Sequence, residues 1–174
     1  MERKKKNILE LTRTTVKEYR EKKKLPIKIV LDNVRSMYNV GAVLRTADAF
    51  LIDGVTLTGI TGIPPHPEIT KTALGAEESV DWCYEEDAPA AVEKLKREGW
   101  KICVLEQTHN SLPLQEFKSE KDERYVLVAG NEVTGVNQKI VDVADIVLEI
   151  PQYGVKHSLN VSVSVGIALW QIVK

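Results

Sequence analysis

Short β-branched apolar runs alternate with stretches of helical periodicity along most of this chain. Five of these runs have the length and composition of buried strands. They are Ile27–Leu31, Gly54–Gly59, Lys101–Leu105, Tyr125–Ala129 and Asp145–Ile150. Strands that are separated by helices indicate βαβ units and a mostly parallel sheet. The pattern therefore predicts a single three-layer α/β domain.

Helices are predicted between these strands, where apolar residues recur at helical spacing. The four segments are Val40–Phe50, Ala88–Glu98, Val136–Val143 and Leu159–Val173. The second has the clearest boundaries, because Asp87 precedes it as an N-cap, Pro89 lies in its first turn and Gly99 follows it. By composition, Ile60–Thr70 and Thr108–Asp122 are predicted as irregular connections.

A polar step interrupts the last apolar run of the chain. Ser158 and Asn160 stand between the predicted strand that ends at Ile150 and the final helix. Pro151 and Gly154 predict a loop there, and Ser158 is predicted to cap the helix. In open α/β sheets, ligands bind at the carboxyl ends of strands, so this loop is expected to line a site.

Length and composition indicate one compact domain. The chain has 174 residues, of which 43% are hydrophobic. Its apolar stretches are shorter than the roughly 20 residues that span a bilayer, and its N-terminus lacks the apolar core of a signal peptide. We therefore expect a cytoplasmic protein without a membrane segment. Cys83 and Cys103 are far apart, and they are predicted to be reduced packing residues.

Positive charge is concentrated at the N-terminus. Residues 1–24 carry ten Lys or Arg and four Glu, whereas residues 25–174 carry fourteen basic and twenty-one acidic side chains. The expected organisation is a basic helical extension, 1–24, attached to a domain, 25–174. The extension could be an electrostatic arm for phosphate backbones. It could also be a helix, Ile8–Tyr19, that docks on its own domain or on a partner through Ile8, Leu11, Thr15 and Tyr19.

Polar residues gather in the loops that follow the predicted strands. Asn39 is expected to cap the helix that carries Arg45, and the Arg45 stem is expected to be partly buried, with its guanidinium directed at an anion or a carboxylate. A cap and a structural salt bridge would also explain this pair. Glu132 stands between Gly130 and Gly135, but this turn lacks the spacing of a dinucleotide or P-loop motif.

The histidines do not predict a metal centre. His66, His109 and His157 are scattered along the chain and lack carboxylate or thiol partners at ligand spacing. No metal is therefore expected.

Three segments together resemble the motifs of the SpoU (TrmH-type) RNA ribose 2′-O-methyltransferases of the SPOUT superfamily. They are Asn39-Val-Gly-Ala-Val-Leu-Arg45-Thr-Ala, Gly130-Asn-Glu132-Val-Thr-Gly135 and Ile150-Pro-Gln-Tyr-Gly-Val-Lys-His-Ser158-Leu-Asn160-Val-Ser. The three occur in the family's order, and the similarity covers about residues 27–173. Lys71-Thr-Ala-Leu-Gly-Ala-Glu-Glu-Ser79 also resembles a family segment.

The resemblance implies an S-adenosylmethionine-dependent RNA methyltransferase acting on tRNA or rRNA. It also implies a SPOUT fold with a deep C-terminal trefoil knot, and a homodimer. The cofactor would be held largely by backbone groups. The implied contacts are Gly130, Ile150 and Leu159, with Thr108 or its neighbours as a further contact.

The same resemblance places Arg45 at the family's proposed base position. Since an arginine pKa above about 12 makes a poor base, we expect Arg45 to pair with the adjacent RNA phosphate while the ribose hydroxyl loses its proton to that ensemble. Asn39 would orient Arg45 or the ribose, and Glu132 would fix Arg45 or neighbouring backbone. Ser158 and Asn160 would shape the loop and position substrate. His157 could serve as a base, or be an exposed loop histidine without a catalytic part.

Two other functions stay open at this point. The chain could be an RNA-binding or assembly protein with the same fold and no turnover, although the complete residue set argues against this. It could also be a small-molecule-binding α/β protein without an RNA partner, against which the basic extension argues. Since about 26 residues precede the first strand, the catalytic surface, the basic extension and the dimer partner are expected to recognise the RNA.

Overall fold

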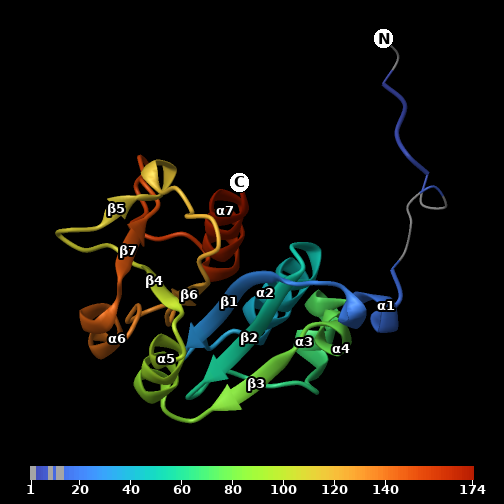
Figure 1. Ribbon diagram of the computed structural model, residues 1–174, viewed down its shortest axis with the longest axis horizontal. Helices are drawn as coiled ribbons and strands as arrows, with labels where there is room; N and C mark the ends of the chain where they lie inside the picture. The colour runs from blue at the N-terminus through green and yellow to red at the C-terminus, as the bar shows by residue number, and fades with distance from the viewer. Residues whose placement is uncertain (1–2, 8–9, 11–13) are drawn as a thin grey trace.

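The computed structural model describes residues 3–7, 10 and 14–174, and within them the strands form one seven-stranded sheet (Figure 1). The strand order is β3-β2-β1-β6-β4-β7-β5, and each neighbouring pair is parallel. The strands are β1 (Leu25–Asp32), β2 (Ile52–Thr58), β3 (Trp82–Glu85), β4 (Lys101–Leu105), β5 (Leu112–Pro113), β6 (Tyr125–Ala129) and β7 (Ile146–Glu149). The predicted parallel α/β architecture is confirmed.

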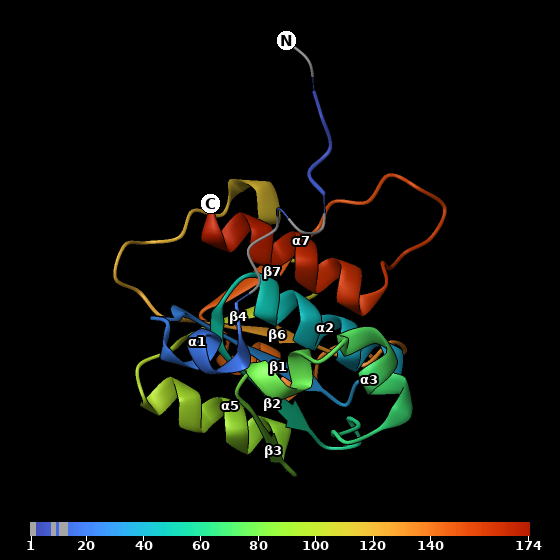
Figure 2. The same ribbon diagram turned by 90° about the vertical axis from the view of Figure 1, so that its right-hand side faces the viewer.

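Helices cover both faces of the sheet (Figure 2). They are α1 (Val16–Glu21), α2 (Met37–Ala49), α3 (Pro67–Ala73), α4 (Ala76–Ser79), α5 (Ala88–Arg97), α6 (Gln138–Val143) and α7 (Val161–Val173), with a 3₁₀ turn, η2 (Leu114–Glu116). Side chains alternate along β1, so Ile29 and Leu31 pack under α2 and α7 whereas Val30 packs towards α5 and α6. This gives the three predicted layers.

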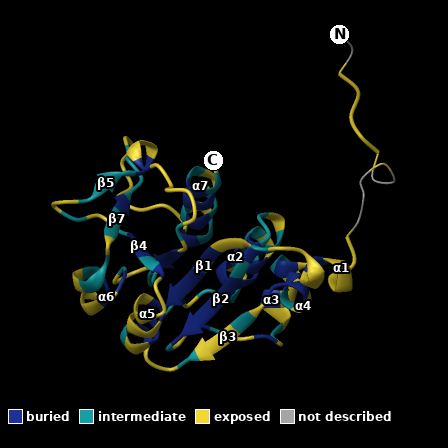
Figure 3. Ribbon diagram, in the orientation of Figure 1, coloured by how far each residue is buried: buried dark blue, intermediate teal, exposed yellow. Residues whose placement is uncertain are grey.

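The central strands were predicted well because they are buried on both faces (Figure 3). β4 and β6 have the predicted bounds, and the other three predicted strands differ by one or two residues at each end. The two edge strands, β3 and β5, were not predicted, since they are short and half exposed. Cys83 is exposed on β3, so its expected packing role is wrong, whereas Cys103 is buried; both thiols are free.

Two predicted helix caps are wrong. Ser36 caps α2, since its Oγ accepts from the Asn39 N–H at 3.3 Å, and Asn39 therefore lies in the first turn. Asn160 caps α7 in place of Ser158, because Asn160 Oδ1 accepts from the N–H groups of Ser162 and Val163. In both cases the helix therefore begins at a different residue from the one predicted.

The two predicted loops contain short elements. The first ends early, because Pro67 begins α3, where its fixed φ and missing N–H suit a first helical position. The second contains β5 and η2. The Gln171 side chain on α7 donates to the Phe117 carbonyl at 2.9 Å, which ties this connection to the C-terminal helix.

The helix of the basic extension packs on the domain. α1 begins after Thr15, whose hydroxyl and Glu18 form a reciprocal capping box. Tyr19 is buried in the core, and the Arg20 guanidinium donates to the Glu78 carbonyl at 2.7 Å. Tyr19 thus docks as one interpretation predicted. The predicted helix Ile8–Tyr19 is wrong at Thr14 and Thr15, which are not helical, and Ile8 and Leu11 lie outside the described residues. No helix in the described part of the chain is long and apolar enough to cross a membrane.

Candidate cofactor and catalytic site

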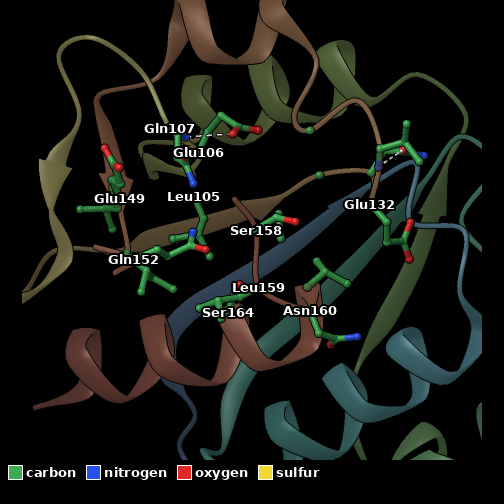
Figure 4. Close-up of a pocket in the computed structure, with 18 residues that line it drawn as sticks. Leu105, Glu106, Gln107, Glu132, Glu149, Gln152, Ser158, Leu159, Asn160 and Ser164 are labelled. Carbon is green, nitrogen blue, oxygen red and sulfur yellow. Dashed lines mark hydrogen bonds between the residues drawn. The ribbon is translucent and has the colours of Figure 1, made fainter. Parts of the chain in front are cut away.

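A cavity of about 490 Å³ opens at the carboxyl ends of β4, β6 and β7 and reaches the start of α7 (Figure 4). Of the predicted site residues, six line it: Gly130, Glu132, Ile150, Ser158, Leu159 and Asn160. These residues come from the second and third motif segments, which the parallel sheet brings to one edge. The cavity size is typical of a small-molecule or cofactor site.

The turn after β6 is closed too tightly for a side chain at Gly130. A Cβ at that position would lie 2.3 Å from Gly135 C and from Val136 N. Asn131 and Gly135 exchange two backbone hydrogen bonds of 3.1 and 3.0 Å, and Gly135 has a φ of +70° that favours glycine. The turn therefore presents bare backbone to the cavity at Gly130.

Glu132 lies at the tip of this turn and reaches the N-terminus of α2. Its carboxylate accepts from the backbone N–H groups of Arg35 and Ser36, at 3.0 and 3.1 Å, and from the Asn39 side-chain amide at 3.0 Å. Partial burial acts to raise the pKa of Glu132, but these donated hydrogen bonds outweigh it and hold the pKa below its ordinary value. The charge is also favourable at a helix N-terminus.

Asn39 and Asn160 extend this contact to α7. Asn160 Oδ1 is committed to capping α7, so its Nδ2 is the group that faces Asn39 and donates to Asn39 Oδ1 at 3.0 Å. Asn39 in turn donates its own Nδ2 to Glu132. One directed chain, Asn160 to Asn39 to Glu132, thus joins the three motif segments, and it orients both amides.

Arg45 does not lie in this cavity. It is exposed on α2 and lines a different hollow, together with Lys22 of the basic extension and Asp48. The predicted burial of its stem is therefore wrong. No hydrogen bond or ion pair of Arg45 occurs within the residues described, so its guanidinium is open to an external anion.

Of Thr108 and its neighbours, which were expected to contact the cofactor, Gln107 lines the cavity and Thr108 does not. Thr108 is not among the cavity residues, and its carbonyl accepts from the Ser111 backbone and hydroxyl. Glu106 and Gln107 line the cavity instead, as does Glu149, whose carboxylate accepts from Ser111 Oγ at 2.6 Å. The available signal was position, since Glu106 and Gln107 directly follow a predicted strand and Glu149 lies near the carboxyl end of another.

The comparisons with known proteins decide the family. A model of the SpoU rRNA Methylase family matches residues 26–170. The chain belongs to the SpoU methylase family. The family assignment predicted from the three motif segments is therefore confirmed, and the second and third of these segments line the cavity described above.

Several SpoU relatives are similar over most of this chain. It is 33% identical to the tRNA (guanosine(18)-2′-O)-methyltransferase of Aquifex aeolicus over 94% of this chain and 76% of that protein. The crystal structure of the A. aeolicus TrmH/SpoU tRNA modifying enzyme superposes with a TM-score of 0.79 at 29% identity, covering 90% of this chain and 80% of that one.

Other relatives are longer than this chain. The AdoMet-bound rRNA methyltransferase structure from Sinorhizobium meliloti matches with a TM-score of 0.78 at 26% identity, over 84% of this chain and 55% of that one. The uncharacterized tRNA/rRNA methyltransferase MG252 of Mycoplasma genitalium is 31% identical over 86% of this chain, which spans 62% of its length.

Proposed function

We propose that this SpoU-family chain is an S-adenosylmethionine-dependent RNA 2′-O-ribose methyltransferase whose substrate is tRNA or rRNA. The observation that carries the proposal is that the second and third motif segments line one cavity and are linked to the first by the hydrogen bonds from Asn160 to Asn39 and from Asn39 to Glu132. The names of the relatives from A. aeolicus and S. meliloti support the same reaction and the same cofactor.

The cavity suits the cofactor in size and in lining. Gly130, Ile150 and Leu159 would hold it, with the bare backbone at Gly130 allowing close approach. When bound, S-adenosylmethionine supplies an electrophilic methyl group on a positively charged sulfonium. Three carboxylates, those of Glu106, Glu132 and Glu149, line the cavity and provide a negative field that favours a cation there.

The chain's own residues must align the ribose hydroxyl and accept its proton. Asn160 lines the cavity and can orient the ribose, while its hydrogen bond to the buried Asn39 fixes the position of its amide. Glu132 fixes the backbone at the start of α2, so it anchors the helix that carries Arg45. Arg45 would pair with the phosphate next to the reacting ribose, as a permanently charged donor, and Ser158 would position substrate from the loop.

A homodimer would complete this arrangement. Val163, Ile167 and Trp170 recur at helical spacing on α7 and are 50%, 41% and 66% exposed. Trp170 also packs edge-on against Phe50 at the end of α2, with 6.5 Å between ring centroids, so the apolar surface continues towards the helix of Arg45. A second copy that covers this stripe would bring its own α2 near the cavity of the first.

The dimer is tested by charge substitution on the stripe. Ile167→Glu combined with Trp170→Glu should shift the protein from dimer to monomer in sedimentation-velocity measurements, because two charges cannot be buried unpaired. Gln115→Glu, on the exposed side of η2, provides a control that adds charge elsewhere. A wild-type monomer, or a dimer that survives the double substitution, would refute this interface.

Three further features complete the proposal. The SPOUT fold implies that the C-terminal segment closes a trefoil knot, and the hydrogen bond from Gln171 on α7 to the Phe117 carbonyl brings that segment against an earlier connection. Residues 1–24 form the basic extension and residues 25–174 the methyltransferase domain, although α1 shares the core of that domain. The cytoplasm is the expected location.

Two methylation measurements test the reaction. RNA from a deletion strain and its parent, mapped for 2′-O-methyl groups, should differ at the substrate nucleotide. With the purified protein and that RNA, Arg45→Ala should abolish methyl transfer, whereas His157→Ala should retain most of it. The reverse result would make His157 the base. Binding of RNA and cofactor without any methyl transfer would favour the RNA-binding alternative.

A further inference from the structure

Two adjacent side chains at the end of β4, Glu106 and Gln107, contact both loops of the cavity. We propose that they are positioning residues, which hold the turn 130–136 and the loop 151–159 in the shape that receives the cofactor. The proposal rests on the proposed function only for the identity of that ligand. Figure 4 shows the two side chains next to one another above the cavity.

Glu106 holds the turn after β6. Its Oε2 accepts from the Val136 N–H at 3.0 Å, and its Oε1 accepts from the Gln107 N–H at 2.8 Å. Gly135 packs directly on this carboxylate, since a Cβ there would lie 2.2 Å from Glu106 Oε2. Gly130 packs in turn on Gly135 and Val136, so Glu106 supports the backbone that gives Gly130 its place.

A carboxylate is the group that this position requires. Both oxygens of Glu106 face backbone N–H donors. A glutamine has the same length but only one acceptor oxygen, so its NH₂ group would be directed at one of the two N–H groups. Either Val136 or Gln107 would lose its acceptor in that variant.

Gln107 holds the loop before α7. Its Nε2 donates to the His157 carbonyl at 2.9 Å. Within the part of the chain that the structure describes, this is the one hydrogen bond that reaches residues 151–159. Burial does not anchor that loop either, because Tyr153 and Val155 are 92% and 90% exposed. The loop therefore depends on Gln107 for its position.

The residues next to this anchor line the cavity. Ser158 and Leu159 follow His157 directly and are both cavity residues. Loss of the Gln107 donor should let them move away from the cofactor. Since one neutral hydrogen bond is involved, the expected loss of S-adenosylmethionine affinity is roughly two- to tenfold.

Limited proteolysis tests the anchor without any cofactor. Lys156 precedes His157, so trypsin cleavage after Lys156 reports local opening of the loop. Gln107→Ala should be cleaved there several times faster than wild type, and Gln107→Glu faster still, because its carboxylate would oppose the His157 carbonyl. Gln115→Ala, an exposed glutamine on η2, is the matched control and should be cleaved as wild type.

Calorimetry supplies the second readout. Both Gln107 variants should bind S-adenosylmethionine more weakly and bind RNA as wild type does. Glu106→Gln should also lose cofactor affinity, whereas Glu93→Gln, an exposed glutamate on α5, should not. Bound cofactor should slow cleavage after Lys156 in the wild-type protein.

The outcomes separate this proposal from the proposed function. Wild-type cleavage and wild-type cofactor affinity in both Gln107 variants would overturn it, as would faster cleavage at every site alike, which would indicate global loosening. If the wild-type protein binds no S-adenosylmethionine but the Gln107 variants still open at Lys156, the anchor stands and the proposed function fails.

Discussion

Asn160 and Asn39, 121 positions apart in the chain, share a side-chain hydrogen bond of 3.0 Å. Its direction is set on both sides, because Asn160 Oδ1 caps α7 and Asn39 Nδ2 donates to Glu132. The side-chain amide of each asparagine can therefore adopt only one of its two flipped orientations. These bonds join the start of α2, the start of α7 and the turn after β6.

The two roles of Asn160 can be separated by substitution. Asn160→Ala removes both the cap and the donor, and should lower the free energy of unfolding by about 1 kcal/mol and abolish most methyl transfer. Asn160→Asp keeps an oxygen for the cap but loses the donor to Asn39, so it should be more stable than Asn160→Ala and equally poor in methyl transfer. Urea unfolding and a single-turnover assay measure the two effects. Full activity of Asn160→Asp would show that the link to Asn39 is dispensable.

Gly130 should tolerate no side chain. Gly130→Ala places a methyl group 2.3 Å from the Gly135–Val136 backbone, so the turn must shift, at a cost of about 1–3 kcal/mol in stability and with a loss of cofactor affinity. Gly154→Ala is the matched control, because a Cβ there has no atom within 4 Å among the residues described, and its effect should stay within about 0.5 kcal/mol. Equal behaviour of the two variants in calorimetry and urea unfolding would contradict the close-approach argument.

Glu132 should contribute to stability in a pH-dependent manner. The pKa of its carboxyl is lower in the folded protein than the ordinary 4.5, so folding favours the ionised form. Its contribution is therefore complete above the unfolded pKa and is lost as the pH falls through the folded pKa. Glu132→Gln should be less stable than wild type near neutral pH, and the difference should shrink under acid.

Urea unfolding at steps from neutral pH down to about pH 3 measures this. Glu93→Gln serves as the control, since Glu93 is exposed on α5 and distant from α2 in the layer arrangement. A stability difference between wild type and Glu132→Gln that stays constant over the whole range would mean that the ionised carboxylate does not stabilise the start of α2.

The basic residues near the N-terminus should contribute to RNA binding and not to cofactor binding. Deletion of residues 1–24 would remove Tyr19 from the core, so neutral substitution of Arg3, Lys4, Lys5 and Lys6 by glutamine is the better experiment. RNA affinity should fall, and its dependence on salt should become shallower, because fewer counterions are released. S-adenosylmethionine affinity should be unchanged. An identical salt dependence would show that these residues do not contact RNA.

Local pattern was sufficient for the elements that are buried on both faces. β4 and β6 were predicted to the residue, since continuous β-branched runs between turn residues have few alternatives. β3 and β5 were missed, because an edge strand of two to four half-exposed residues has no distinctive period and exists through its pairing with β2 or β7. The predicted N-caps of α2 and α7 were wrong by two or three residues for a related reason, since several polar residues near each helix start could act as the cap.

The candidate site was likewise predicted only in part from the sequence. Motif spacing identified Asn39, Glu132, Ser158 and Asn160, but it placed Arg45 in a partly buried setting that the exposed face of α2 does not provide. It named Thr108 or its neighbours, but it did not indicate the contacts that Glu106 and Gln107 make with Val136 and His157, 30 and 50 positions away. No local signal carries such pairings.

The sequence by itself determined the parallel α/β class, the family and the three motif segments, because these depend on periodicity and on residues close together in the chain. Only the tertiary structure decided that Asn160, Asn39 and Glu132 form one directed chain, that Gln107 anchors the last loop and that Arg45 stands apart from the cavity. The physical reason is that a hydrogen bond requires atoms about 3 Å apart, and which distant atoms meet at that distance is set by how the layers pack.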